Sequence, residues 1–334
     1  MEILRKIWTQ GKAGEDNGFQ RRIQIYIYMN IYYNILLSRS LQELFLSKDT
    51  LKGFESQRLR SYCTSQCMEP TRDLDSYGRL LLEGDLSAVK AEYRGRVQKK
   101  LQGPSGSSDA LTLEVAEELV AQDLASLHWG PTRVPIYNLL GLFSLIVPSF
   151  RPSYIGIAKF FIDTAKVPVH GKDLSGTTAL SHSFSTKPAF DLEYAQILYD
   201  AGGDVNHRNR YGGYVAQEIV QVYDPQDSQV VRRAMDALEW FLIHGGSVDI
   251  LDGDGVSAGR VIRTLKSKIP GFSILVEKES KKRMVKGNKC CTLCGREGEK
   301  LMLCSKCKKA RYCHPQTRVC QKLDWRGHMK GCKA

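Results

Sequence analysis

Seven cysteines and one histidine near the carboxyl end of this 334-residue chain have the spacing of metal ligands. Two Cys-x2-Cys pairs come first, then two single cysteines, then a His-x3-Cys pair; the residues are Cys291, Cys294, Cys304, Cys307, Cys313, Cys320, His328 and Cys332. Together they make two complete sets of four ligands. A structural zinc site takes four Cys or His ligands and leaves no position open for a substrate. The spacing therefore predicts a zinc-held module that binds a partner, not a catalytic metal centre.

The other cysteines bear on the compartment. Of the ten cysteines, eight lie within residues 290–332. Such clustered pairs indicate thiolates held by metal in a reducing compartment, whereas a disulfide-stapled secreted domain spreads its cysteines over the fold. Cys63 and Cys67 have no further Cys or His nearby and are predicted to be ordinary thiols. Cys290 lacks the x2 spacing that its neighbour Cys291 has, so it is predicted to be a spare thiol.

The net charge of +12 belongs to the carboxyl-terminal part of the chain. Residues 281–334 hold 16 Lys and Arg against 3 Asp and Glu, whereas the preceding 280 residues hold 32 against 33. Seven zinc-bound thiolates and two Zn²⁺ would lower the charge of this region to about +10, because a zinc-bound thiol is deprotonated. A basic module could meet nucleic acid or an acidic protein surface. The basic side chains could equally offset the thiolates and keep a small domain soluble.

The tail resembles a MYND-type zinc finger over residues 291–332. The resemblance rests on the cysteine spacing, on an aromatic residue before Cys313, and on the ending Cys320-Gln-x2-Asp-Trp325-x2-His328-x3-Cys332. It implies two interleaved zinc sites. The first would use Cys291, Cys294, Cys313 and Cys320, and the second Cys304, Cys307, His328 and Cys332.

Local geometry supports part of this assignment. His328 and Cys332 lie four residues apart, so they share one face of a helix and can reach one ion. Six residues separate Cys313 from Cys320, where the family usually has three, and His314 is therefore a competing ligand for Cys320. A module of about 42 residues has too little apolar core to fold alone, so zinc binding would supply its folding energy.

The resemblance also implies a shallow groove for a short proline-rich peptide beside the last helix. The family's groove residues correspond here to Gln321 and Trp325. Trp offers a broad apolar face to an extended proline peptide, and Gln can bond the peptide backbone. The alternative is that Trp325 packs under the helix as core.

Residues 130–276 repeat weakly. The segments beginning at Asp173, Asn209 and Asp252 share an Asp/Asn-x2-Gly turn, and they start 36 and 43 residues apart. Apolar helical stretches precede the turns, and Gly202 and Gly245 are placed where a helix end favours a left-handed residue. The pattern resembles the ankyrin repeat, whose period is near 33, with the longer insertion expected near residues 223–228. An irregular helical domain is the alternative.

These patterns predict a mainly α fold in five regions. Residues 1–40 are expected to be a doubtful or disordered leader, residues 41–129 a helical region with a Gly/Ser linker near 103–108, and residues 130–276 an ankyrin-like solenoid. A basic linker over 277–290 and the zinc finger over 291–332 follow. The leader's apolar run, residues 23–37, is too short and too polar to span a membrane, and no membrane partner is expected.

The favoured function is a non-enzymatic adaptor whose solenoid and zinc finger each bind a protein or peptide. A nucleic-acid-associated transcriptional regulator that uses the basic tail is the alternative. A methyltransferase-related protein is less favoured, because the Asn-His-x-Cys-x-Pro-Asn motif that accompanies MYND fingers in SET-domain enzymes is absent from the sequence. The resemblance implies a eukaryotic protein of the cytoplasm or nucleus.

Overall fold

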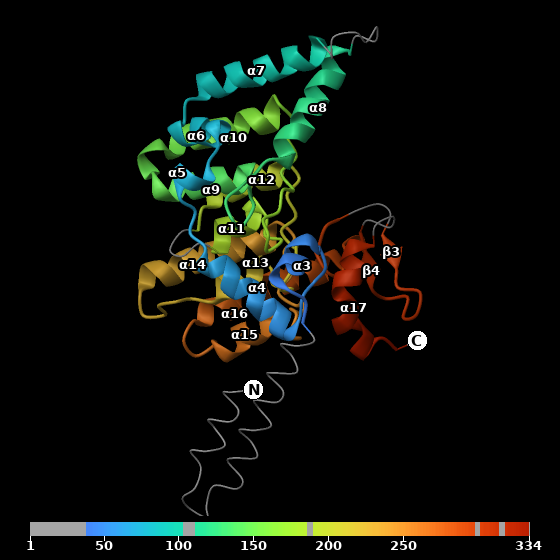
Figure 1. Ribbon diagram of the computed structural model, residues 1–334. Coiled ribbons are helices and arrows are strands. Elements are labelled where there is room, and N and C mark those ends of the chain that lie inside the picture. The colour runs from blue at the N-terminus through green and yellow to red at the C-terminus, as the bar shows by residue number, and fades with distance from the viewer. Residues whose placement is uncertain (1–37, 103–110, 186–189, 298–300, 314–317, 334) are drawn as a thin grey trace, which may run out of the picture.

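The computed structural model describes residues 38–102, 111–185, 190–297, 301–313 and 318–333 (Figure 1). Over these residues the protein is mainly helical, as predicted, with two short two-stranded antiparallel sheets. Apart from residues 38–40, the predicted leader lies outside the described residues, as does the predicted Gly/Ser linker at 103–108.

Four helix pairs make up the repeat array, which runs through the middle and lower part of Figure 1. The pairs are α9 (Ile136–Ile146) with α10 (Arg151–Asp163), α11 (Ala179–Ser185) with α12 (Leu192–Asp200), α13 (Val215–Val220) with α14 (Ser228–Ile243), and α15 (Ala258–Thr264) with α16 (Pro270–Lys286). The first helix of each pair follows a tight turn. This recurrence confirms the predicted ankyrin-like array.

The turns are built by one local hydrogen bond that recurs three times. Asp173 Oδ1 accepts from the Thr177 amide at 2.9 Å, Asn209 Oδ1 from the Gly213 amide at 2.9 Å, and Asp252 Oδ1 from the Val256 amide at 2.8 Å. In each turn a glycine has a left-handed φ, from 75° to 79°. A separate turn over residues 130–133, ahead of α9, joins β1 (His128–Trp129) to β2 (Val134–Pro135), with Trp129 opposite Val134. The predicted Asp/Asn-x2-Gly motif thus has a direct physical cause.

The far ends of the helix pairs are also tied together. Gly202 and Gly245 follow α12 and α14 with φ of 96° and 85°, as helix stops do. Asn206 joins these two loops, because its Nδ2 donates to the Gly245 carbonyl at 2.9 Å and its Oδ1 accepts from the Ser247 amide at 3.0 Å. The predicted insertion near residues 223–228 lies between α13 and α14.

Helices from the amino-terminal region cover the first end of the array. They are α5 (Pro70–Asp73), α6 (Ser76–Glu83), α7 (Leu86–Gln102) and α8 (Leu113–Ser126). Tyr154 of α10 is fully buried and donates to the Leu82 carbonyl at 2.7 Å. The side chains of Val89, Tyr93 and Phe160 belong to the same apolar core as the array. These helices therefore cover the outer face of the first repeat, which would otherwise be exposed.

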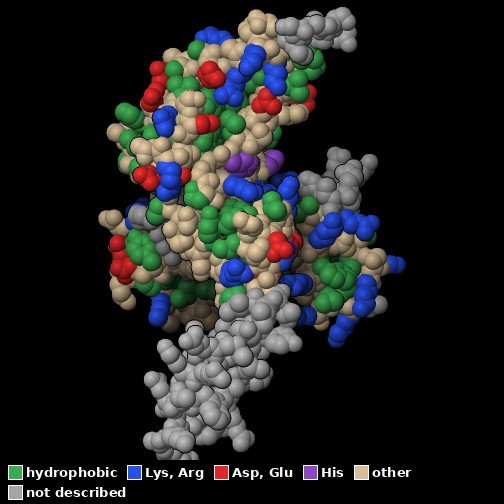
Figure 2. Space-filling view, viewed as in Figure 1, with side chains coloured by type: hydrophobic (Ala, Val, Ile, Leu, Met, Phe, Trp, Pro, Cys, Tyr) green, Lys and Arg blue, Asp and Glu red, His purple; other side chains and the backbone are tan. Residues whose placement is uncertain are grey.

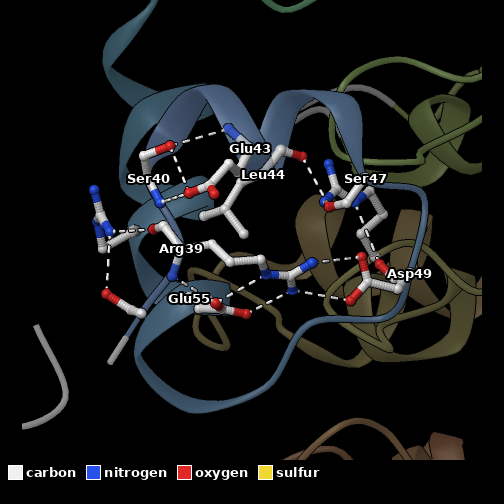
Figure 3. A network of polar contacts seen from close by, with 10 residues as sticks. Arg39, Ser40, Glu43, Leu44, Ser47, Asp49 and Glu55 are labelled. Atoms are coloured by element: carbon white, nitrogen blue, oxygen red, sulfur yellow. Dashed lines mark hydrogen bonds and ion pairs between the residues drawn. The ribbon is translucent and has the colours of Figure 1, made fainter. Parts of the chain in front are cut away.

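Two further helices, α3 (Leu41–Leu46) and α4 (Gly53–Ser65), fold back over the repeat turns. Leu44, Leu51 and Leu59 pack with Leu174 in a separate small core. The loop between the helices is fixed by Arg39, whose guanidinium contacts Asp49 at 2.9 Å and Glu55 at 2.6 Å (Figure 3). We call α3, α4 and this loop the strap.

The carboxyl-terminal finger contains β3 (Met302–Leu303), β4 (Arg311–Tyr312) and α17 (Val319–Gly331), and it lies beside the lower half of the array (Figure 1). The structure differs from the predicted basic linker at 277–290. Residues 277–286 continue α16, and residues 287–289 form the short 3-10 helix η3. The helix extends because its first half packs on α14 and α15, while its lysines face outward.

No single helix among the described residues is long and apolar enough to cross a membrane, and only the bent pair α9 and α10 reaches that length and composition when both helices are taken together.

Candidate functional site

The first group of thiols lies inside the finger. Cys291, Cys294, Cys313 and Cys320 are all buried, and their Sγ atoms lie within 4.8 Å of one another. Cys313 Sγ is 3.5 Å from that of Cys294 and 3.3 Å from that of Cys320. Four sulfurs bound to one zinc at about 2.3 Å lie about 3.8 Å apart in a tetrahedron. This set of four thiols therefore fits one zinc ion.

The second group brings the remaining ligand candidates together: Cys304, Cys307, His328 and Cys332. His328 Nε2 lies 3.3 Å from Cys304 Sγ and 3.6 Å from Cys307 Sγ, and Cys332 Sγ lies 3.8 Å from Cys304 Sγ. The i, i+4 pair His328 and Cys332 approaches from the end of α17, as its spacing predicts. This group has the donor set and separations of a second zinc site.

The two Cys-x2-Cys pairs form matching knuckles. The Gly295 amide donates to the Cys291 carbonyl and the Lys308 amide to the Cys304 carbonyl, both at 2.9 Å. Gly295 and Lys308 have left-handed φ values of 68° and 53°. Each knuckle thus turns four residues back on themselves and points both of its sulfurs at one place.

Backbone amides of the second knuckle stabilise thiolates before any metal binds. Hydrogen bonds from the amides of Cys307 and Lys306 lower the pKa of Cys304 to about 6. Amides of Ala310 and Lys309 likewise lower the pKa of Cys307. A hydrogen bond to the charged form favours that form. The knuckle therefore favours ionised sulfur, the form that coordinates zinc.

The first group shows why a cation is required there. Hydrogen bonds from Cys294, Cys313 and Cys320 lower the pKa of Cys291, and its hydrogen bond with Cys320 raises the pKa of Cys320. The pKa values of Cys291 and Cys294 are lowered, whereas those of Cys313 and Cys320 are raised, because like charges crowd one buried point. A divalent cation removes this repulsion, and Zn²⁺ with four thiolates leaves a net charge of −2.

Tyr312, the aromatic residue before Cys313, joins the two groups. Its side chain is fully buried, and its hydroxyl donates to Asp324 Oδ2 at 2.6 Å. This bond fastens β4, which directly precedes Cys313, to α17, which carries Cys320 and His328. It therefore links ligand candidates of both sites. The Asp of the Asp-Trp step thus has a structural role that its spacing alone did not reveal.

Gln321 and Trp325 lie one turn apart on α17. Trp325 is 42% exposed, so it is not a core residue, and Gln321 is half-buried. Met329, one turn further on, is also exposed, and so are Leu303 and Val319. The finger therefore exposes apolar side chains, Trp325 among them, and Gln321 lies on the same helix.

Basic side chains surround these apolar side chains. Figure 2 shows hydrophobic side chains gathered on the finger among Lys and Arg. In the described residues 301–313 and 318–333, nine Lys and Arg accompany a single acidic residue, Asp324, which Tyr312 already engages. The finger's surface is thus strongly positive around its apolar part.

Arg283 links the finger to the repeat array. It donates through Nη1 to the Leu293 carbonyl at 2.7 Å and through Nη2 to the Gly246 carbonyl at 2.8 Å. Leu293 lies in the first knuckle and Gly246 in the loop after α14. In the sequence Arg283 lies within the predicted basic linker over 277–290, and nothing in its local pattern indicates a bridging role. His314, the competing ligand, lies outside the described residues.

Comparison with known proteins agrees with the geometry of the finger. Residues 291–332 match the family model for the MYND finger. No curated protein matches the chain in sequence.

Two solved ankyrin proteins are similar to part of the chain. An ankyrin repeat domain from Acinetobacter baumannii AYE is 15% identical, with a TM-score of 0.36, over 56% of this chain and 95% of its own. A second ankyrin repeat protein is 14% identical, with a TM-score of 0.36, over 58% of this chain and 98% of its own. The repeat architecture itself rests on the helix pairs and turns described above.

Proposed function

We propose that this protein is a non-enzymatic adaptor whose zinc finger docks a short proline-rich peptide and whose repeat array carries a second protein-binding surface. The observation that carries the proposal is the half-exposed Trp325 on a helix whose end supplies two ligand candidates of one zinc site. Zinc would make the small finger rigid, so the peptide would meet a preformed surface. Thiolate ligands favour a reducing compartment, and we propose the cytoplasm or nucleus as its location.

The chemistry of the finger supports a peptide ligand. The apolar faces of Trp325 and Met329 can cover proline rings, and Gln321 can donate to or accept from the peptide backbone. One groove of this size gives weak, transient binding, so the adaptor would need its second surface to gain avidity.

The substitution Trp325→Ala tests the finger. Loss of an aromatic anchor typically costs 2 kcal/mol or more, so we expect the affinity for a proline-rich peptide to fall about 30-fold or more. The affinity can be measured by fluorescence anisotropy with peptides selected on an array by the full chain, and the zinc content by native mass spectrometry. Tyr223→Ala is the matched control, because Tyr223 is an exposed aromatic residue outside the finger.

The two readouts separate the possible results. Weak peptide binding with two zinc ions retained supports the proposal. Unchanged peptide binding would show that the α17 surface is not the groove, and loss of zinc would assign Trp325 a structural role.

A second candidate function is contact with nucleic acid, which the excess of Lys and Arg on the finger favours. Binding through phosphates weakens steeply as salt increases, since each contact releases counterions. Titration of the full chain with duplex DNA and single-stranded RNA between 50 and 200 mM salt, on the order of the range where this effect is large, tests the candidate. Binding that does not change with salt would exclude it.

A further inference from the structure

A cavity of about 670 Å³ lies between the repeat array and the strap. Its floor comes from α9, α11 and α13, and its walls come from the turns around Asp173, Asn209 and Asp252. Small residues leave the space open, among them Gly141, Ala179 and Gly213. The volume falls within the range of ligand pockets, about 300–1,000 Å³. The cavity is separate from the zinc finger and from its exposed apolar side chains.

The strap closes one side of this cavity. Arg60, Cys63 and Thr64 of α4 contribute to the lining. The strap is held by the Arg39 ion pairs in Figure 3 and by Arg210, whose Nη2 donates to Ser47 Oγ at 2.8 Å and whose Nη1 donates to the Leu174 carbonyl at 3.1 Å. The strap therefore partly encloses the cavity, so a bound side chain could make more contacts there than on an open surface.

The lining is acidic. Among the described residues it holds five carboxylates and one permanent cation, Arg60; the carboxylates are those of Asp173, Asp191, Glu218, Asp252 and Asp254. Arg151 neutralises Asp191 from outside at 2.7 Å. Asp252 accepts hydrogen bonds from neutral donors, including Gln217 Nε2 at 2.6 Å, and no ion pair to its carboxylate is resolved among the described residues. An anionic ligand would be repelled and a cationic one attracted.

One buried acceptor in the lining lacks a donor. Asn138 is only 6% exposed, and its Nδ2 donates to the Thr177 carbonyl at 3.1 Å. That bond identifies the other terminal atom as Oδ1, which has no hydrogen-bond partner in the described part of the protein. An unpaired buried acceptor is costly, about 1–3 kcal/mol, and this oxygen has almost no accessible surface, so a donating ligand would be favoured if the Asn138 side chain turned toward the cavity.

At the cavity, one guanidinium of the protein already stacks on an aromatic ring. The Arg60 guanidinium carbon lies 4.9 Å from the centroid of the Tyr211 ring. A planar cation with five N–H donors can stack on an aromatic face while its edges meet carboxylates and amide oxygens. A lysine ammonium offers fewer donors and no flat face.

We propose that this cavity binds an arginine side chain presented by an extended segment of a partner protein. The guanidinium would face the carboxylates at the turns, and it would donate to Asn138 Oδ1 once that side chain turns toward the cavity. The inference rests on the proposed function, because it names the kind of partner that the repeat array takes. It does not depend on the peptide surface of the finger.

The proposal can be tested by NMR on the full, zinc-loaded, ¹⁵N-labelled chain. The probe is the capped tripeptide acetyl-Gly-Arg-Gly-amide, compared with the same tripeptide carrying citrulline, which keeps the shape and loses the charge. We expect the arginine peptide to shift the side-chain amide signal of Asn138 and to bind about tenfold more tightly than the citrulline peptide, the ratio typical of one charge-assisted hydrogen bond.

A pair of charge reversals locates the binding. Asp254 is an exposed lining residue with no hydrogen bond to its carboxylate among those resolved, so Asp254→Lys should fold and should weaken arginine-peptide binding about tenfold or more. Asp236→Lys makes the same charge change at an exposed position of α14 that does not line the cavity. We expect it to leave the affinity unchanged.

Three results would overturn the proposal. They are equal affinity for arginine and citrulline peptides, equal weakening by both charge reversals, and absence of any shift at Asn138. None of these results would affect peptide capture by the finger, so failure here can be told apart from failure of the proposed adaptor function.

Discussion

At the scale of single residues, neighbours in sequence have different environments in the finger. The Cys291 sulfur belongs to the first group of four thiols, whereas the adjacent Cys290 thiol points away, toward the Arg283 and Gly287 carbonyls. Both residues are buried. Burial alone therefore does not distinguish a ligand candidate from a spare thiol; the knuckle geometry does.

This contrast gives a matched pair of substitutions. We expect Cys291→Ser to reduce the zinc content from two ions to one, because three sulfurs do not complete a structural site whose binding contributes on the order of 10–16 kcal/mol. Cys290→Ser should retain both ions. Native mass spectrometry of the full chain counts the ions, and two zinc ions in the Cys291→Ser protein would refute the ligand assignment.

At the scale of the elements, stacking depends on the closeness of successive turns. The left-handed Gly212, with φ of 75°, lies against the next turn, and a Cβ there would be 2.6 Å from the Gly253 nitrogen. The equivalent Gly255 has φ of 79° but nothing within 4 Å of such a Cβ. Glycine is thus required at position 255 by the turn alone, and at position 212 by both the turn and the neighbouring turn.

Alanine at these two glycines should therefore have different effects. Both substitutions put a side chain in the left-handed region, which costs about 1–2 kcal/mol. Gly212→Ala also forces the adjacent turns apart, which should add about 1–3 kcal/mol. Urea unfolding followed by circular dichroism measures both, and equal losses of stability would contradict the close stacking of the turns.

Histidine at a second stacking contact makes the array sensitive to acid. His207 Nε2 lies 2.8 Å from the Gly176 carbonyl of the preceding turn, and burial lowers the pKa of His207 below its usual 6.5. The folded state therefore binds fewer protons than the unfolded state as the pH falls through 6.5. Stability from this group is present above that pH and is lost on acidification.

An ordinary histidine titrates between about pH 7.5 and 5.5. Over about this interval we expect the melting temperature to fall less in His207→Gln than in the wild type. Glutamine can still donate to the Gly176 carbonyl but does not titrate. His170→Gln removes an exposed imidazole and is the control. Because the zinc sites also respond to acid, the informative quantity is the difference between wild type and variant, and no difference would contradict the role of His207.

At the scale of the whole molecule, the finger and the array share one apolar core. Cys291, Leu293 and Tyr312 of the finger belong to the same buried cluster as Phe241 and Phe272 of the array. Gly245 approaches the Cys294 carbonyl so closely that a Cβ would lie 3.0 Å from it. The two binding surfaces of the proposed adaptor are thus held in a fixed relation.

Arg283 should be needed for this rigid relation. Replacement by methionine keeps much of the stem's volume and removes two charge-assisted hydrogen bonds, each worth about 1.5–3 kcal/mol. We expect faster hydrogen exchange in residues 245–250 and 291–297 with both zinc ions retained. Lys282→Met, on the exposed face of the same helix, is the control, and identical exchange in the two variants would show that the finger docks without Arg283.

The sequence by itself determined the features whose causes are local. The knuckles, the i, i+4 ligand pair and the Asp/Asn-x2-Gly turns each depend on residues a few positions apart, so spacing was enough to predict them. The mainly α fold followed from the helical spacing of apolar residues. The ankyrin-like array followed from the resemblance to the ankyrin repeat, and the two groups of four ligand candidates followed from the resemblance to the MYND finger.

The tertiary structure alone decided which distant segments meet. Arg210 contacts two residues of the strap, Asp49 and Ser47, from which it is separated by 161 and 163 positions in the sequence. Arg283 contacts Gly246, 37 positions before it. The extension of α16 through the predicted linker, the roof over the cavity and the unpaired oxygen of Asn138 depend on the same long-range packing. No period or motif records such contacts, because they arise only when separately formed elements bury their faces together.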